Sequence, residues 1–101
     1  MPTGRTRFHL HIKGRVQGVY FRELTRQLAE QLDLGGWVRN LSDGQVEAVF
    51  EGDPARVAQA VAWCRKGPPG AWVSGVETRD EEPLGETGFR ILSTRYAWEQ
   101  T

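Results

Sequence analysis

The chain has 101 residues, of which 39% are hydrophobic and 26% are charged, and its 13 basic side chains balance its 13 acidic ones. This length and composition predict a single soluble domain over residues 1–101, with a core from about residue 7 to residue 92. The zero net charge provides no global field toward nucleic acid or a membrane, so any site for an anion must be local.

The cellular compartment is indicated by features that the chain lacks. Its one cysteine, Cys64, cannot form a disulfide within the chain, which suits a reducing compartment. Residues 1–7 are short and polar and do not resemble a signal peptide. No apolar run approaches the roughly 20 residues that a membrane span needs. We therefore expect a cytoplasmic protein with no membrane partner.

Residues 7–13 alternate between apolar and polar side chains, a pattern typical of a half-buried strand. The apolar positions are Phe8, Leu10 and Ile12, and the polar positions are His9, His11 and Lys13. Gly14 and Gly18 follow, with no acidic residue between them. They allow a short loop to curl so that several backbone N–H groups converge. Such a loop beside a helix N-terminus attracts anions.

Residues 21–33 have the apolar spacing of a helix, which Gly35–Gly36 would end. Arg22 lies in the first turn, where a positive side chain opposes the helix dipole. Its guanidinium offers a planar fork of donors that fits phosphate oxygens. This conflict with the dipole indicates that Arg22 serves to bind an anion.

The rest of the chain predicts four strands and a second helix. In chain order we expect strand 37–40, a turn at 42–44, strand 45–51, a helix that starts at Asp53–Pro54 and ends before Gly67, strand 72–79, an acidic loop at 80–83 and a short strand 88–92. The order β-α-β-β-α-β plus a last short strand predicts an α+β fold. Its form is a ferredoxin-like split β-α-β sandwich, with two helices on one face of a mixed, largely antiparallel sheet.

This topology brings two distant residues to one edge of the sheet. A strand, a helix and a second strand connected in this way leave both strands running in the same direction. The glycine loop after the first strand and Asn40 at the end of the second therefore share an edge, with one strand between them. Backbones ~10 Å apart are expected, so Arg22 and Asn40 can close over a small ligand.

Two sequence motifs carry a family resemblance. GRVQGVYFR at residues 14–22, followed by LGGWVRN at 34–40 and SDGQVE at 42–47, is similar to the acylphosphatase family. The resemblance extends from about residue 7 to residue 92. It implies an enzyme that hydrolyses the carboxyl-phosphate anhydride of acyl phosphates, with no metal, no cofactor and no covalent intermediate.

The resemblance also implies a role for each motif position. Arg22 would bind the phosphoryl group through its guanidinium, and Asn40 would orient the attacking water. The backbone N–H groups of the loop would hold the phosphoryl oxygens; its residues are Arg15, Val16, Gln17, Gly18, Val19 and Tyr20. The expected partners are a small acyl phosphate and inorganic phosphate or other small anions, without nucleic acid, and the chain is expected to be a monomer.

Neither the motif at residues 14–22 nor the motif at 34–40 contains a histidine or a carboxylate that could act as a base. Phosphoryl transfer from a good leaving group needs mainly positioning and charge stabilisation. We therefore expect the water's proton to go to a substrate phosphate oxygen.

Other readings of single features remain open. Taken alone, Gly14 and Gly18 fit an ordinary turn. Arg22 alone fits a solvated helix residue, and Asn40 alone fits a hairpin residue that makes a local hydrogen bond. His9 and His11 could form half of a metal site, but an exposed sheet face is the expected reading. Residues 80–82 are expected in a solvated loop. The remaining expectations concern packing: a buried, structural Cys64, packing roles for Trp37, Trp63 and Trp72, and an undetermined Trp98 in the tail 93–101.

Two other functions compete with hydrolysis. Split β-α-β sheets often bind single-stranded RNA by stacking bases on aromatic side chains. Here the polar face would carry Glu47 and Glu51 instead of an aromatic pair, which argues against RNA. The other alternative is an acylphosphatase-like domain that binds anions for regulation, as occurs inside larger maturation proteins.

Overall fold

The computed structural model describes residues 4–96, in which five strands and two helices alternate in the predicted order. These elements are β1 (Thr6–Arg15), α1 (Phe21–Gln31), β2 (Gly35–Asn40), β3 (Val46–Gly52), α2 (Pro54–Lys66), β4 (Trp72–Glu81) and β5 (Phe89–Ile91). Trp98 lies outside the described residues, as does most of the tail.

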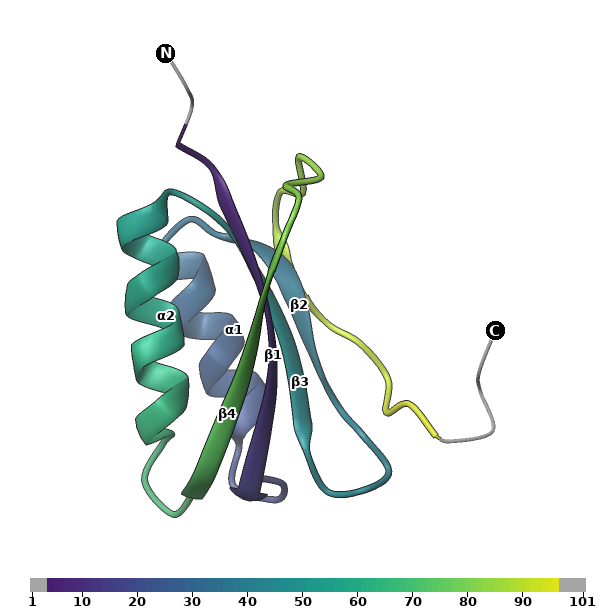
Figure 1. Cartoon of the computed structure of the whole chain (residues 1–101). Coiled ribbons are helices and arrows are strands. Elements are labelled where there is room, and N and C mark those ends of the chain that lie inside the picture. Colours follow the sequence, from purple (N-terminus) through teal and green to yellow (C-terminus); the bar gives the residue numbers. More distant parts are fainter. Residues whose placement is uncertain (1–3, 97–101) are drawn as a thin grey trace.

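The strands form one sheet in the order β4-β1-β3-β2-β5. β1 runs antiparallel to β3 and β4, β2 runs antiparallel to β3, and β5 runs parallel to β2. Both helices lie on the same face of this sheet (Figure 1). The predicted ferredoxin-like fold is therefore confirmed, including the single strand, β3, between β1 and β2.

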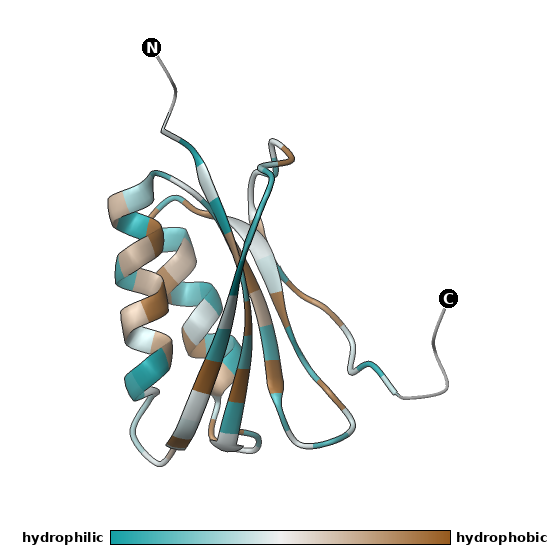
Figure 2. Ribbon diagram, viewed as in Figure 1, coloured by the Kyte–Doolittle hydropathy of each residue, from teal (hydrophilic) through white to brown (hydrophobic). Residues whose placement is uncertain are grey.

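The core lies between the helices and the inner face of the sheet. Brown and teal bands alternate along the strands in Figure 2, as expected for a sheet with one apolar face. The fully buried apolar strand residues of this core are Leu10, Ile12, Val38, Val46, Ala48 and Phe50. The helices contribute Phe21, Ala29, Val57, Ala60 and Cys64. Cys64 is thus the buried thiol that was expected, and burial raises its pKa.

The two helices begin and end for local reasons. At the start of α2, the Asp53 side chain accepts a hydrogen bond from the backbone N–H of Arg56 (3.2 Å), and Pro54 occupies the first turn. α1 ends two residues earlier than predicted, and Gly35–Gly36 belong to β2. Glycine is required at position 36 because φ is +134° and a Cβ atom there would clash with the carbonyl oxygen of Val49.

Other expectations about the second half of the chain are wrong. Asp80 and Glu81 extend β4 instead of forming a loop, because β1 is long enough to pair with them as far as Arg7. Trp72 is 65% exposed at the start of that edge strand and does not pack in the core. Trp63 does pack, with its ring edge-on to Phe21 at 5.4 Å. Neither helix in residues 4–96 is long and apolar enough to cross a membrane.

The outer face of the sheet is less solvated than its polar side chains predict. Glu51 is fully buried, although it was expected on a wet face. Its carboxylate accepts hydrogen bonds from Arg5 and Arg7, and from backbone N–H groups at residues 84–86. Burial raises the pKa of Glu51, but these donors outweigh burial and lower the pKa to about 2. The segment after β4 folds over this end of the sheet, so the carboxylate is removed from water.

Candidate active site

The loop that connects β1 to α1 has the open backbone expected of an anion site. Gly18 has a φ of +76°, and Tyr20 takes the left-handed conformation immediately before α1 (φ +60°). No side chain caps the helix N-terminus. Within residues 4–96, the N–H groups of residues 17–20 have no hydrogen-bond acceptor. These N–H groups and the helix dipole are therefore available to a bound anion.

The two glycines of the motif have different roles. Gly14 lies inside β1, at an irregularity in its pairing with β4, where a Cβ atom would clash with the carbonyl oxygen of Trp72. Gly18 lies in the loop with open space around it, so its requirement is the left-handed backbone. Arg15, predicted in the loop, is instead the last residue of β1, paired with Trp72. The loop between β1 and α1 is therefore shorter than the motif.

Arg22 lies in the first turn of α1 and is half-buried. In the described part of the chain it makes no ion pair and no side-chain hydrogen bond. The neighbouring carboxylate of Glu23 is engaged by Arg26 and Gln27, and the hydrogen bond from Arg26 lowers its pKa. The guanidinium of Arg22 is therefore left without a protein anion, next to the open loop.

Asn40 is the last residue of β2, where its backbone oxygen accepts a hydrogen bond from the N–H of Arg95 (3.0 Å). Its side-chain Oδ1 is buried and has no donor among residues 4–96. Buried polar atoms are nearly always paired, so an unpaired one at a cavity is a candidate for binding a water or a ligand.

One cavity of about 480 Å³ brings these groups together. It is lined by Val16, Gln17, Gly18, Tyr20, Phe21, Arg22, Glu23, Asn40 and Ile91. Six of the eight predicted site residues are in this lining, and Arg15 and Val19 are not. The loop after β1 and the end of β2 lie at the same edge of the sheet (Figure 1).

Gln17 connects the two halves of this cavity, a contact that the sequence did not predict. Its Nε2 donates to the carbonyl oxygens of Leu41 (2.8 Å) and Gln45 (2.9 Å). Both acceptors lie in the turn that follows Asn40. The side chain therefore fixes the binding loop against the turn beside Asn40. No spacing or composition signal in the sequence distinguishes this glutamine from an ordinary loop residue.

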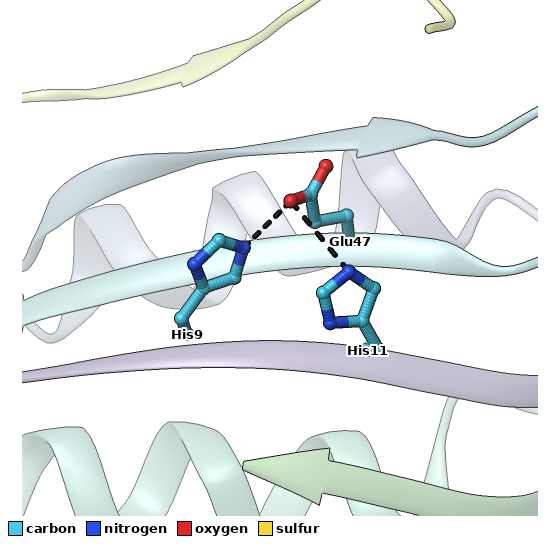
Figure 3. Close-up of side chains that lie close together, drawn as sticks. All are labelled: His9, His11 and Glu47. Atoms are coloured by element: carbon cyan, nitrogen blue, oxygen red, sulfur yellow. Dashed lines mark hydrogen bonds and ion pairs between the residues drawn. The ribbon is translucent and has the colours of Figure 1, made fainter. Parts of the chain in front are cut away.

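A second polar cluster lies on the outer face of the sheet and was also missed. His9, His11 and Glu47 approach one another there, although the histidines were expected on an exposed face (Figure 3). Glu47 is only 4% exposed. Its hydrogen bond to His9 raises the pKa of the imidazole, with help from Glu81 and against burial. The sequence pattern did not predict this cluster because Glu47 lies on a different strand from the two histidines.

Comparisons with known proteins identify the family of the chain. The acylphosphatase family model matches residues 8–91. An acylphosphatase from Syntrophobacter fumaroxidans is 56% identical over 93 residues, covering 91% of this chain and 96% of that protein. One from Gloeobacter violaceus is 52% identical over 86 residues, covering 85% of this chain and 92% of that protein.

A solved structure supports the same assignment. The acylphosphatase from Coxiella burnetii is 40% identical, with a TM-score of 0.84 over 88% of this chain and 94% of that one. The likeness therefore covers both the sequence motifs and the arrangement of the elements that carry them. The chain belongs to the acylphosphatase family of enzymes.

Proposed function

We propose that the chain hydrolyses acyl phosphates in the cavity between the 16–20 loop and the end of β2. The observation that carries this proposal is the unpartnered Oδ1 of Asn40 in a cavity that also holds the free guanidinium of Arg22. An acceptor for water and a cation for phosphate are the two groups that the reaction needs at one place.

The phosphoryl group would bind to the loop and to Arg22. The free N–H groups of residues 17–20 donate to its oxygens, and the guanidinium adds a full positive charge and further donors. The loop is fixed before substrate arrives, because β1 and α1 hold its two ends. Charge that develops on the equatorial oxygens is therefore stabilised without rearrangement.

Asn40 would position the attacking water. Its Oδ1 accepts a hydrogen bond from the water, which leaves an oxygen lone pair directed at phosphorus. A bond forms between the water oxygen and phosphorus while the bond from phosphorus to the acyl oxygen breaks. The acyl group leaves as a carboxylate, and the second product is inorganic phosphate.

The water's proton would go to a phosphate oxygen of the substrate. Among the described residues, the cavity lining contains one carboxylate, Glu23, and no histidine. Glu23 is engaged by Arg26 and Gln27, so it is a poor base. A carboxylate leaving group needs no strong acid. A rate that titrates with an essential enzyme group near neutral pH would contradict this step.

Three further features belong to the proposal. Residues 1–101 act as one domain, the chain works as a monomer, and inorganic phosphate or another small anion competes with substrate for the loop and Arg22. In the regulatory alternative, the same site would bind phosphate without turnover.

The deciding experiment measures hydrolysis of benzoyl phosphate, a simple acyl phosphate, with inorganic phosphate as the competitor. We expect turnover and competitive inhibition by phosphate. Phosphate binding by a folded chain that gives no turnover above background would overturn hydrolysis in favour of the regulatory alternative. Absence of both would refute the proposed site.

A further inference from the structure

We propose that His9, His11 and Glu47 form a binding site for a divalent transition metal such as Zn²⁺ on the outer face of the sheet. The site would be separate from the acyl phosphate cavity, whose lining contains none of the three residues. Imidazole nitrogen and carboxylate oxygen are ligands that Zn²⁺ accepts.

The backbone places the three side chains on one surface. His9 and His11 are two residues apart on β1 and therefore share a face, and Glu47 lies opposite His11 in the pairing of β1 with β3. The Nε2 atom of His9 is 2.6 Å from Oε2 of Glu47, and the Nε2 atom of His11 is 3.7 Å from it. Figure 3 shows both rings directed at that carboxylate.

The spacing of the ligand atoms suits a tetrahedral ion. All three lie within 4.8 Å of one another. Zinc bonds of about 2.0–2.2 Å place tetrahedral ligand atoms roughly 3.3–3.6 Å apart. The distances from Oε2 of Glu47 to the Nε2 atoms of His9 and His11, 2.6 Å and 3.7 Å, lie on either side of that range. A modest rotation of the side chains would therefore form the site. The ion would replace the proton that His9 and Glu47 share.

The hydrogen-bond partners of His9 and Glu47 support the proposed metal site. The Nδ1 atom of His9 contacts Oε2 of Glu81 at 2.7 Å, and the Nε of Arg39 donates to Oε1 of Glu47 at 2.7 Å. A histidine whose outer nitrogen donates to a carboxylate presents its other nitrogen to a metal in a fixed orientation. Arg39 likewise leaves Oε2 of Glu47 as the oxygen available for the ion.

The site is accessible from solvent and has room for a further ligand. His9 and His11 line an open cavity of about 530 Å³ together with Glu77, Thr78 and Arg79, and His11 and Glu47 line a second open cavity of about 380 Å³. Three protein ligands leave one tetrahedral position for water. Because the ligands come from β1 and β3, a bound ion would also cross-link two central strands of the sheet.

Titration of the chelator-treated, tag-free full chain with Zn²⁺ in a calorimeter tests the proposal. We expect one equivalent to bind, and Co²⁺ to give the visible absorption of a tetrahedral site without a thiolate band, because Cys64 is buried. The chain contains only two histidines, so no third imidazole can substitute. Zinc should also raise the melting temperature.

His11→Gln is the decisive variant, since it removes one ligand but keeps the contacts of His9 with Glu47 and Glu81. We expect it to weaken Zn²⁺ binding by more than ~100-fold, which exceeds the loss expected when a residue that only hydrogen-bonds to a metal ligand is removed. The circular dichroism spectrum and acyl phosphate hydrolysis should stay unchanged. Glu81→Gln should weaken binding by about 10–100-fold. Glu77→Gln, which removes a cavity carboxylate that is not a ligand, should have no effect.

Two results would overturn the proposal. In the first, the folded parent chain binds no Zn²⁺, and the cluster is then a proton-bridged ion pair. In the second, His11→Gln binds Zn²⁺ as tightly as the parent chain, and the metal is then held by surface carboxylates. Both results leave acyl phosphate hydrolysis measurable, so failure of the metal site is distinguishable from failure of the proposed function.

Discussion

The two polar regions of this molecule differ in how their groups are paired. The first region, the loop edge, is the end of the sheet where the 16–20 loop meets the end of β2. Among the residues that the structure describes, Arg22 has no anionic partner, and the buried Oδ1 of Asn40 has no hydrogen-bond donor. Around Glu51, the carboxylate is equally buried but accepts hydrogen bonds from two arginines and three backbone N–H groups. The first region contains groups that lack partners, and the second contains groups that are saturated.

We expect this difference to separate groups that act on a ligand from groups that hold the fold together. A buried polar atom without a partner costs stability, so it persists where a ligand or water completes it. A buried charge with every lone pair satisfied stabilises the fold but has nothing left to offer a substrate. Substitutions in the two regions should therefore have opposite consequences, with activity lost in one region and stability lost in the other.

Arg22→Ala should have the largest effect on activity. We expect kcat/KM for benzoyl phosphate to fall by about 10³-fold or more, equivalent to about 4 kcal/mol, because the variant loses the cation that stabilises the transferring phosphoryl group. Inhibition by phosphate should weaken as well. Arg65→Ala, an exposed arginine on α2, is the matched control and should retain full activity.

The stability of Arg22→Ala tests the same difference between the two regions. Arg22 has no partner in residues 4–96 and opposes the dipole of α1. The free energy of unfolding in urea should therefore stay within about 0.5 kcal/mol of the parent value. A large loss of stability would show that Arg22 supports the fold, and the division between the regions would fail.

Glu51→Ala should do the reverse. Its removal leaves the buried guanidinium of Arg7 short of a partner, and we expect the free energy of unfolding to fall by about 3 kcal/mol. The matched control is Glu77→Ala, which breaks an exposed pair with Lys13 and should cost about 0.5 kcal/mol or less. The kcat of folded Glu51→Ala should remain near the parent value. A selective loss of kcat would contradict the structural role.

The sequence predicts the loop edge much better than the Glu51 region, for a physical reason. Local signals mark β1, α1 and the start of α2, and the topology alone places Arg22 and Asn40 at one edge. Alternation along β3 marks Glu51 as polar without saying whether water or protein covers it. Its partners lie 44 and 46 residues before it and 33–35 residues after it. Such contacts depend on tertiary structure, as do the grouping of Glu47 with two histidines and the bonds of Gln17.

Asn40→Ala should lower kcat by about 10²-fold, close to 2.7 kcal/mol, because the water loses its acceptor. Phosphate inhibition should survive, since the loop and Arg22 remain. Stability should be unchanged or slightly higher, because an unpaired buried oxygen is removed. If this variant and Arg22→Ala lose phosphate affinity equally, the separate roles of the two residues are wrong.

Acidification should weaken the Glu51 region through protonation. The pKa of Glu51 falls from its ordinary value of 4.5 to about 2 in the folded chain. The ionised carboxylate therefore stabilises the fold above the unfolded pKa, and this contribution is lost as the pH falls toward 2. Urea unfolding between pH 6 and pH 2 should show this decline in the free energy of unfolding, and the total decline should be smaller by about 2 kcal/mol in Glu51→Gln. Parallel slopes in the two proteins would contradict the assignment.

Gln17→Ala should give the smallest effect and tests how the loop edge is held. Gln17 is exposed, and its two hydrogen bonds connect the binding loop to the turn after Asn40. Their loss should cost about 1 kcal/mol of stability and lower kcat by about 10-fold, because the loop and the water-binding amide are no longer fixed relative to each other. Phosphate inhibition, which in the proposed mechanism depends on the loop and Arg22, should change less than kcat. Gln27→Ala is the control, a glutamine on α1 whose side chain donates a hydrogen bond to Glu23. If Gln17→Ala lowers phosphate affinity as much as kcat, its side chain binds the anion directly and does not act by alignment.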